Sequence, residues 1–160
     1  MQSKITLFAE NEHCCGCGAC MNICPKKAIT MHEDEYGFLY PQIDENVCIK
    51  CGVCQSVCSF QNKKETHEPV ATFAISAKDQ KIHINSASGG AFAVLAEKII
   101  TEDGVVFGAA FDNDWNVCHI AINDIQDIKK LQGSKYVQSN IDKAYQIVKA
   151  YLAQGKKVLF

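Results

Sequence analysis

The spacing of apolar residues predicts regular elements most clearly in the second half of the chain. Short apolar runs rich in β-branched residues, bounded by glycine or polar turns, are typical of strands. The runs are residues 70–77, 105–111, 117–122 and 156–160. The polar sequence DNDWN separates the second run from the third, which predicts a turn between two neighbouring strands.

Three segments between these runs carry apolar residues at helical spacing, and each has a candidate N-cap and a glycine stop. The cap and stop pairs are Ser88 and Gly104, Asp124 and Gly133, and Asn140 and Gly155. Strands that alternate with helices predict an α/β domain over residues 70–160. The last strand reaches Phe160 without a turn or polar tail, so we expect this domain to be partial (truncated).

The first sixty residues have another character, because they hold nine of the ten cysteines. Between two cysteine runs, residues 28–31 and 38–40 predict a hairpin whose acidic turn ends at Gly37. The polar sequence QNKKETHEP, residues 61–69, predicts a linker. We therefore expect one domain over residues 1–60, a linker, and the α/β part after it.

Eight cysteines form two copies of the spacing C-x2-C-x2-C-x3-C. The copies are Cys14, Cys17, Cys20 and Cys24, followed by Cys48, Cys51, Cys54 and Cys58. This spacing is typical of bacterial proteins with two [4Fe-4S] clusters, in which the fourth cysteine of each run binds the other cluster. The spacing therefore assigns Cys14, Cys17, Cys20 and Cys58 to one cluster, and Cys48, Cys51, Cys54 and Cys24 to the other.

Structural zinc is the alternative, since paired C-x2-C knuckles bind it tetrahedrally. Zinc motifs rarely chain three cysteines at this spacing and add a fourth, twice, so the pattern favours iron–sulfur clusters. Ser59 stands where Pro25 follows the first run, which affects the exit of the chain and not the ligands. Cys15 is a fifth cysteine in the first run. Cys14 fits the register and Cys15 is expected near the cluster, but an exchange of the two as ligand stays open.

Composition narrows the partners and the compartment. The net charge of -2 gives no reason to expect nucleic acid or an anionic membrane surface as a partner. All 16 basic residues are lysines, so an anion site must use lysine or backbone amides. No signal peptide or membrane span is visible in the sequence. Ten cysteines without a secretory signal favour metal or redox chemistry in a reducing, cytoplasmic compartment.

Over residues 5–60, the two motifs and the hairpin resemble the two-cluster bacterial ferredoxins, which implies an α+β ferredoxin-like dicluster domain. The strings SASGGAFAVLAEKI and LQGSKYVQSNIDKAYQIVKAYLAQGKKVLF, with GFLYPQID, are similar to the beta subunits of coenzyme F-420 hydrogenase/dehydrogenase. The string GSKYVQS, residues 133–139, is the most specific match. The resemblance implies electron transfer between two [4Fe-4S] clusters, a bound flavin (FAD) and, in some members, coenzyme F-420 as substrate. In that family functional groups follow the last strand, so we expect residues 1–160 alone to be inactive.

Two short segments are candidates for contact with a cofactor. Ser88, Gly89 and Gly90 open a helix, where exposed amides are suited to a flavin pyrophosphate. The alternative is that these glycines only permit a tight turn and close packing. The second segment holds Ser134, Lys135, Tyr136 and Ser139. Its lysine could neutralise a phosphate and its tyrosine could stack on a flat ring, whereas a polar loop with the tyrosine anchored in the core is the alternative.

The residues and the resemblance together predict an iron–sulfur electron-transfer subunit or domain of a flavin-dependent oxidoreductase. A redox partner protein or a sibling oxidoreductase subunit is the expected partner. One alternative is a ferredoxin-like carrier or docking module without its own flavin. Another is a structural role for the clusters, which a pair of clusters in this register disfavours. The sequence assigns no catalytic residue.

Overall fold

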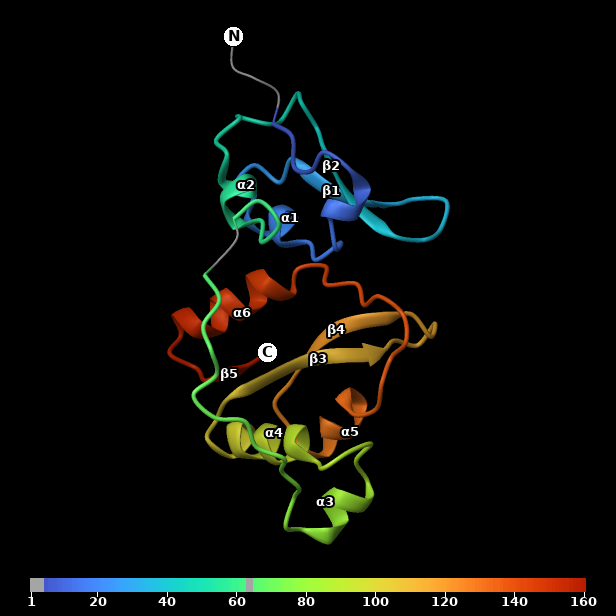
Figure 1. Cartoon of the computed structure of the whole chain (residues 1–160), viewed down its shortest axis with the longest axis vertical. Coiled ribbons are helices and arrows are strands. Elements are labelled where there is room, and N and C mark those ends of the chain that lie inside the picture. Colours follow the sequence, from blue (N-terminus) through green and yellow to red (C-terminus); the bar gives the residue numbers. More distant parts are fainter. Residues whose placement is uncertain (1–4, 63–64) are drawn as a thin grey trace. The chain divides into compact units, whose positions relative to one another are not determined.

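The computed structural model describes residues 5–62 and 65–160. The chain divides into two compact units, Met1–Glu68 and Pro69–Phe160 (Figure 1). The unit boundary falls next to Pro69, at the end of the polar segment that separates the cysteine motifs from the helices and strands. Within the described residues, no helix is long and apolar enough to cross a bilayer.

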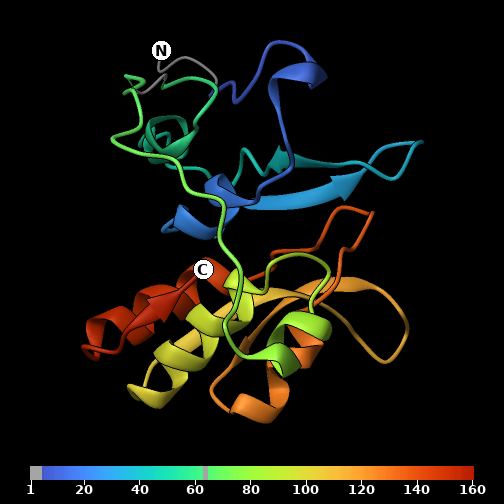
Figure 2. The ribbon, with the colours of Figure 1, turned by 60° about the horizontal axis from the view of Figure 1, so that its bottom comes forward.

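The first unit is built from short elements around the cysteine motifs. In chain order they are η1 (Asn11–His13), α1 (Ala19–Ile23), β1 (Ile29–Glu33), β2 (Leu39–Ile43) and α2 (Val53–Val57). The strands β1 and β2 pair antiparallel, and their turn projects from the unit (Figure 2). The expected hairpin is therefore present, with longer strands. Its turn is fixed by Asp34, whose Oδ1 accepts from the backbone N–H groups of Tyr36 and Phe38 at 2.9 Å.

The core of the first unit is small. Leu7, Ile29 and Cys54 are buried together. Partly buried neighbours complete the cluster: Ile5, Phe8, Cys20, Met21, Cys24 and Ile43. Three of these nine residues are cysteines of the two motifs, so the core and the motifs occupy the same space.

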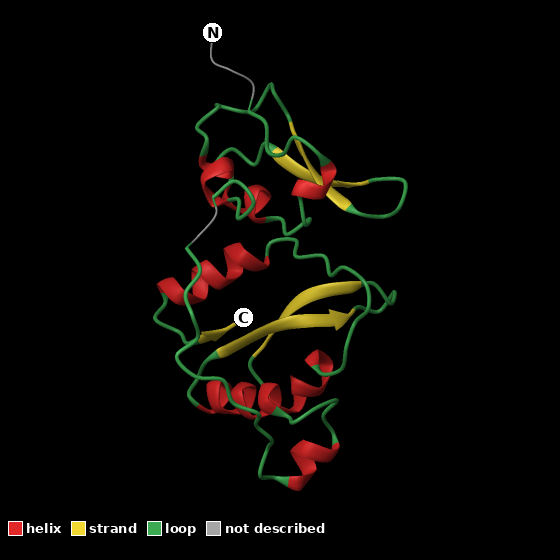
Figure 3. Cartoon of the chain, viewed as in Figure 1, coloured by secondary structure: helices red, strands yellow, loops and turns green. Residues whose placement is uncertain are grey.

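The second unit is a three-stranded sheet between helices (Figure 3). Its elements are α3 (Gln80–Ile84), α4 (Ala91–Thr101), β3 (Val105–Phe111), β4 (Val117–Ile122), η2 (Ile125–Asp127), α5 (Ile128–Leu131), α6 (Ala144–Ala153) and β5 (Val158–Leu159). The strand order is β4-β3-β5, with β4 antiparallel and β5 parallel to β3. Helices α4 and α5 lie on one side of the sheet and α6 lies on the other.

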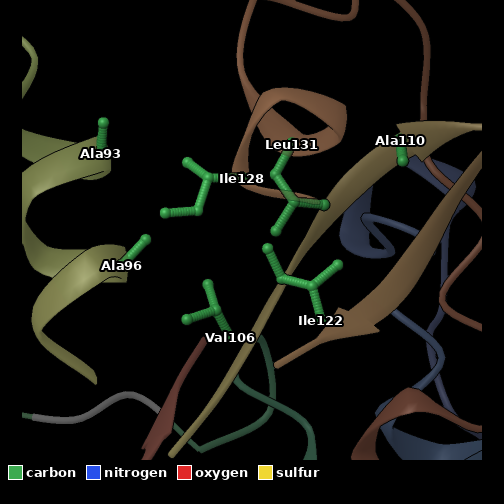
Figure 4. Close-up of a cluster of buried hydrophobic side chains, with 7 residues drawn as sticks. All are labelled: Ala93, Ala96, Val106, Ala110, Ile122, Ile128 and Leu131. Carbon is green, nitrogen blue, oxygen red and sulfur yellow. The ribbon is translucent and has the colours of Figure 1, made fainter. Parts of the chain in front are cut away.

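Apolar side chains fill both sides of this sheet. On the α4 and α5 side, the cluster consists of Ala93, Ala96, Val106, Ala110, Ile122, Ile128 and Leu131 (Figure 4). On the α6 side, the buried residues are Val105, Phe107, Ile141 and Ala144. Val105 and Phe107 point to one face of β3 and Val106 to the other, which is the alternation expected of a strand covered on both faces.

The prediction of a strand at residues 70–77 is wrong. The segment has no regular structure, and the side chains of Val70, Phe73 and Ile75 are exposed. The central strand β3 already pairs on both of its edges, with β4 and β5. The segment has the apolar, β-branched composition of a strand, but it has no strand to pair with. Composition alone does not show whether a pairing partner is present.

Two helix starts also differ from the expected ones. Helix α4 begins at Ala91 after Gly90, which has a positive φ of 82°, so Ser88 is not its N-cap. Helix α6 begins at Ala144 rather than after Asn140. The backbone of Asn140 instead bonds to β4: its N–H donates to the Val117 carbonyl at 2.8 Å, and its carbonyl accepts from His119 at 2.9 Å. The Asn140 side chain also accepts from the Asp142 N–H at 2.9 Å, so a local turn forms at Asn140, but the helix begins only at Ala144.

Other local signals agree with the structure. The Asp124 side chain accepts from the N–H of Gln126 at 2.8 Å and caps the helical segment η2 and α5, as predicted. The same signal exists at Asp79, which accepts from Lys81 N–H at 2.7 Å and caps α3, a helix that the apolar pattern did not predict. Helix α3 is only five residues long, too short for its apolar spacing to be noticed.

Candidate metal centres

The two cysteine motifs fold into the same backbone shape. In each motif, the residues on both sides of the second cysteine have a left-handed conformation. The φ values are 64° at Gly16 and 67° at Gly18, and 55° at Lys50 and 76° at Gly52. Left-handed residues in such loops turn successive N–H groups toward a common centre, which suits a negatively charged cluster. Lys50 adopts this conformation without being glycine, and the glycine pattern of the sequence did not identify it.

Each loop leads into a five-residue helix that ends at the fourth cysteine of its motif. Cys24 follows α1 with φ -64° and ψ 114°, and Cys58 follows α2 with φ -70° and ψ 119°. The N–H of Cys24 donates to the Met21 carbonyl, and that of Cys58 to the Gln55 carbonyl. In this extended conformation, each fourth cysteine lies at the far end of the helix from the other three.

Two cavities collect the motif cysteines in sets of four. The first is lined by Cys14, Cys17, Cys20 and Cys58, with Cys15 as a fifth thiol. The second is lined by Cys48, Cys51, Cys54 and Cys24. Each cavity thus takes three cysteines from one motif and one from the other. These are the two sets that the spacing groups together, and their binding to iron stays a prediction.

The lining of both cavities fits a cluster with thiolate ligands. Apart from the cysteines, the first cavity is mostly apolar, including Leu7, Phe8 and Phe60, and the second includes Ile29 and Ile43. Soft thiolates in an apolar surrounding are the usual environment of iron–sulfur clusters. In the part of the chain that the structure describes, no three His, Cys, Asp or Glu side chains lie close enough to hold a single metal ion.

Burial and backbone N–H groups set the electrostatics of the thiols. Burial raises the pKa of Cys20 to about 12, and it also raises the pKa values of Cys14 and Cys17. At the second cavity, burial raises the pKa of Cys54. A thiolate in such places is stable only with a positive partner, and iron provides that partner when a cluster binds.

Backbone N–H groups also donate to the sulfur atoms. The N–H of Ala28 donates to Cys24 Sγ at 3.3 Å, and that of Lys50 donates to Cys48 Sγ at 3.4 Å. At the corresponding position of the first motif, the Gly16 N–H donates to Cys14, which offsets part of the increase in pKa that burial causes. Such bonds stabilise charge on the ligand sulfur and tune cluster potentials.

Two glutamines that the motif analysis did not identify hold the N-terminal segment against the first cavity. The Gln55 side-chain amide donates to the Thr6 carbonyl at 3.0 Å, and the Gln61 amide donates to the Leu7 carbonyl. Leu7 lines the first cavity. Gln61 belongs to the segment predicted as a linker, so the first residues of that segment contact the first unit. A glutamine in a polar segment carries no sequence signal for such a role.

In the second unit, the two candidate cofactor segments meet only in part. Ser88, Gly89, Gly90 and Ser134 line one cavity of about 440 Å³ beside the start of α4. Lys135 and Tyr136 do not line it. The Lys135 ammonium donates to the Gln132 carbonyl at 2.8 Å, and burial lowers its pKa. The Tyr136 side chain is 96% exposed, so it is neither anchored in the core nor in the cavity.

The glycines of this cavity have structural reasons to be glycine. A Cβ at Gly89 would lie 2.2 Å from the backbone oxygen of Ile75, so only glycine fits the close approach of the two chain segments. The Gly89 carbonyl accepts from the Ala77 N–H at 2.6 Å, which holds the same contact. The packing interpretation that the sequence left open therefore has direct support.

Ser139, the last candidate of the GSKYVQS string, lies apart from the cavity. Its hydroxyl is 2.8 Å from Nδ1 of His119, a half-buried residue of β4 whose pKa burial lowers. The His119 ring stacks on Phe160, with centroids 5.5 Å apart and planes at 10°. The contact between Ser139 and His119 joins the segment before α6 to strand β4.

Comparisons with known proteins agree with the cysteine geometry. A protein-family model described as a 4Fe-4S dicluster domain matches residues 13–62. One subunit of the F(420)H(2) dehydrogenase of Methanosarcina mazei is 21% identical over 150 residues, which cover 88% of this chain and 43% of that protein. One subunit of the H(2):CoB-CoM heterodisulfide,ferredoxin reductase of Methanothermobacter marburgensis is 29% identical over 75 residues, which cover 39% of this chain and 11% of that protein.

The chain thus spans less than half the length of either of these relatives. A third relative is shorter. An uncharacterized ferredoxin of Methanocaldococcus jannaschii is 33% identical over 54 residues, which cover 34% of this chain and 69% of that ferredoxin. Through its first unit, the chain therefore belongs to the ferredoxins with a 4Fe-4S dicluster domain.

Proposed function

We propose that the chain is an electron-transfer subunit or domain of a flavin-dependent oxidoreductase. The observation that carries this proposal is the pair of cavities in one small unit, each lined by four cysteines that come from both motifs. Two adjacent clusters make a path for electrons, whereas one would be enough to brace a fold of this size. The relatives are named as subunits of a dehydrogenase and a reductase, which supports partner subunits as the source or destination of the electrons.

The first cluster is held by Cys14, Cys17, Cys20 and Cys58, and the second by Cys48, Cys51, Cys54 and Cys24. When bound, such clusters supply one-electron steps, and a flavin converts these to two-electron chemistry. The chain's own contribution is to hold the eight sulfurs, to donate N–H groups to them, and to limit the access of water through apolar linings.

A flavin would occupy the cavity that Ser88, Gly89, Gly90 and Ser134 line. Its volume of about 440 Å³ and the backbone N–H groups at the start of α4 support this placement. Helix α4 has 11 residues, long enough for its dipole to favour a phosphate at its N-terminus. The alignment with the F(420)H(2) dehydrogenase protein over 88% of the chain supports coenzyme F-420 as the substrate of such a site.

A carrier or docking module without flavin is the second candidate, and specific observations favour it. The contact between Gly89 and Ile75 explains that glycine without a ligand. Lys135 is engaged by carbonyl groups, and Tyr136 projects into solvent. In this case, the second unit recruits the redox partner and the clusters carry out all of the electron transfer.

The experiment that separates the two candidates is a measurement of flavin, iron and sulfide in protein purified without oxygen. About one flavin per chain beside two clusters supports the flavin-dependent function. Clusters without flavin support the carrier. The variant Ser134→Trp fills the second-unit cavity and should release the flavin without loss of iron. Tyr136→Ala, at an exposed position outside the cavity, is the matched control and should retain both.

A further inference from the structure

The two cysteine-lined cavities differ in one position. The first cavity is lined by five thiols, because Cys15 lines it together with its four proposed ligands. The second cavity is lined by four thiols, and the residue that corresponds to Cys15 is Ile49, which lines it as well. The position after the first cysteine therefore belongs to the cavity lining in both motifs, but it offers a metal ligand only in the first.

The loops that carry Cys15 and Ile49 also have the same backbone shape. In each motif, the position is followed by a left-handed residue, Gly16 with φ 64° or Lys50 with φ 55°. In each motif, that residue's N–H donates to the sulfur of the first cysteine, either Cys14 or Cys48. Cys15 and Ile49 thus stand at equivalent points of two equivalent loops.

Cys15 is in contact with one ligand in particular. A side-chain hydrogen bond joins the Cys15 and Cys17 thiols, and both residues line the first cavity. Both residues are exposed, whereas Cys14, Cys20 and Cys58 are half-buried. Cys17 is therefore the most exposed of the four proposed ligands, and a bond from it to iron would be the one most accessible to water.

We propose that Cys15 is a reserve ligand of the first cluster, which takes over the iron of Cys17 when that bond is lost. The proposal rests on the assignment of Cys14, Cys17, Cys20 and Cys58 to this cluster. In the exchange, the bond from iron to Cys17 Sγ breaks and a bond from iron to Cys15 Sγ forms. The proton of the Cys15 thiol passes to the Cys17 sulfur, and no electron is transferred.

The decisive variants remove Cys17 with and without the reserve. Cys17→Ala is expected to keep both clusters, whereas Cys15→Ala/Cys17→Ala loses half of the iron and sulfide. The second motif provides the control, because Cys51→Ala has Ile49 instead of a reserve thiol and should lose half of the iron. Ile49→Cys added to Cys51→Ala should restore it. Iron content and the electron paramagnetic resonance (EPR) spectrum of the reduced protein report these outcomes without any activity assay.

Equal iron loss in Cys17→Ala and in the double variant would overturn the reserve role. Cys20→Ala separates this failure from a failure of the ligand assignment, since it must lose the first cluster if that assignment holds. If Cys17→Ala is insoluble, the test passes to Cys15→Ala with Cys17 intact. Release of iron to a chelator should then be about tenfold faster than in the wild type, as for removal of a group that bonds to a metal ligand. An unchanged rate would overturn the proposal.

Discussion

In the second unit, helices pack on both faces of a three-stranded sheet, whereas the first unit consists of short helices and one hairpin around two cysteine-lined cavities. Twelve hydrophobic residues are buried in the second unit and four in the described part of the first. Isolated helices below about 12 residues and isolated two-stranded hairpins are marginal in water. The comparison indicates that apolar burial stabilises the second unit, and it predicts that bound clusters would stabilise the first.

The largest expected effect follows from removing the clusters. Iron chelation without oxygen should unfold the first unit, because its remaining core is built around Leu7, Ile29 and Cys54. The second unit should stay folded. In an amide NMR spectrum, the signals of β1 and β2 should lose their dispersion while those of β3 and β4 stay in place. Retention of the β1 and β2 signals in iron-free protein would show that the first unit folds without its clusters.

A substitution in the apolar core should destabilise the second unit and leave the first unit and its clusters unchanged. Leu131→Ala removes a buried side chain from the cluster on the α4 and α5 side and should cost about 3 kcal/mol of unfolding free energy in the second unit. Iron content should not change. Leu152→Ala, at a side chain that is 56% exposed on α6, is the control and should cost less than about 0.5 kcal/mol. Urea unfolding followed by circular dichroism measures both, and equal effects would contradict the assigned core.

A smaller effect is expected at the cap of η2 and α5. Asp124→Ala removes the acceptor for the Gln126 N–H and should cost about 1 kcal/mol in the second unit. Asp114→Ala in the β3–β4 turn changes the same charge without removing a helix cap, and it should have little effect. Thermal unfolding of the two variants checks the difference. An Asp114 variant as unstable as the Asp124 variant would indicate a charge effect instead of a cap.

The smallest effect concerns pH. Hydrogen bonds from Lys157 and Lys98 lower the pKa of Glu102 to about 2 from 4.5, so the folded second unit favours the ionised form. Its contribution should be complete above pH 4.5 and should disappear as the pH falls toward 2. Because Glu102 is exposed, the effect is small and sensitive to salt. As the pH is lowered from about 6 to the pKa of about 2, the midpoint temperature of unfolding should fall less steeply in Glu102→Gln than in the wild type. An equal fall in the two proteins would contradict the ion pairs.

The sequence predicted the features that depend on local chemistry. The β3–β4 pair and the cap at Asp124 could be predicted because turn residues and caps act over a few residues. The crossed grouping of the cysteines was inferred instead from a spacing that is typical of two-cluster proteins, and iron binding by these sets stays a prediction. Residues 70–77 and the start of α6 could not, because a strand partner and the contact of Asn140 with β4 are distant in the sequence. The sequence also could not show which residues of the GSKYVQS string face the cavity. Ser134 lines it, whereas Lys135 and Tyr136 do not.

The crossing of the fourth cysteines is the central claim, and Cys58→Ala tests it most directly. Cys20→Ala and Cys54→Ala provide reference EPR spectra of reduced protein that lacks the first or the second cluster, respectively. Although Cys58 belongs to the second motif, the Cys58→Ala spectrum should match that of Cys20→Ala, because Cys58 lines the first cavity. A match to Cys54→Ala would mean that each motif binds its own cluster and would contradict the crossed arrangement.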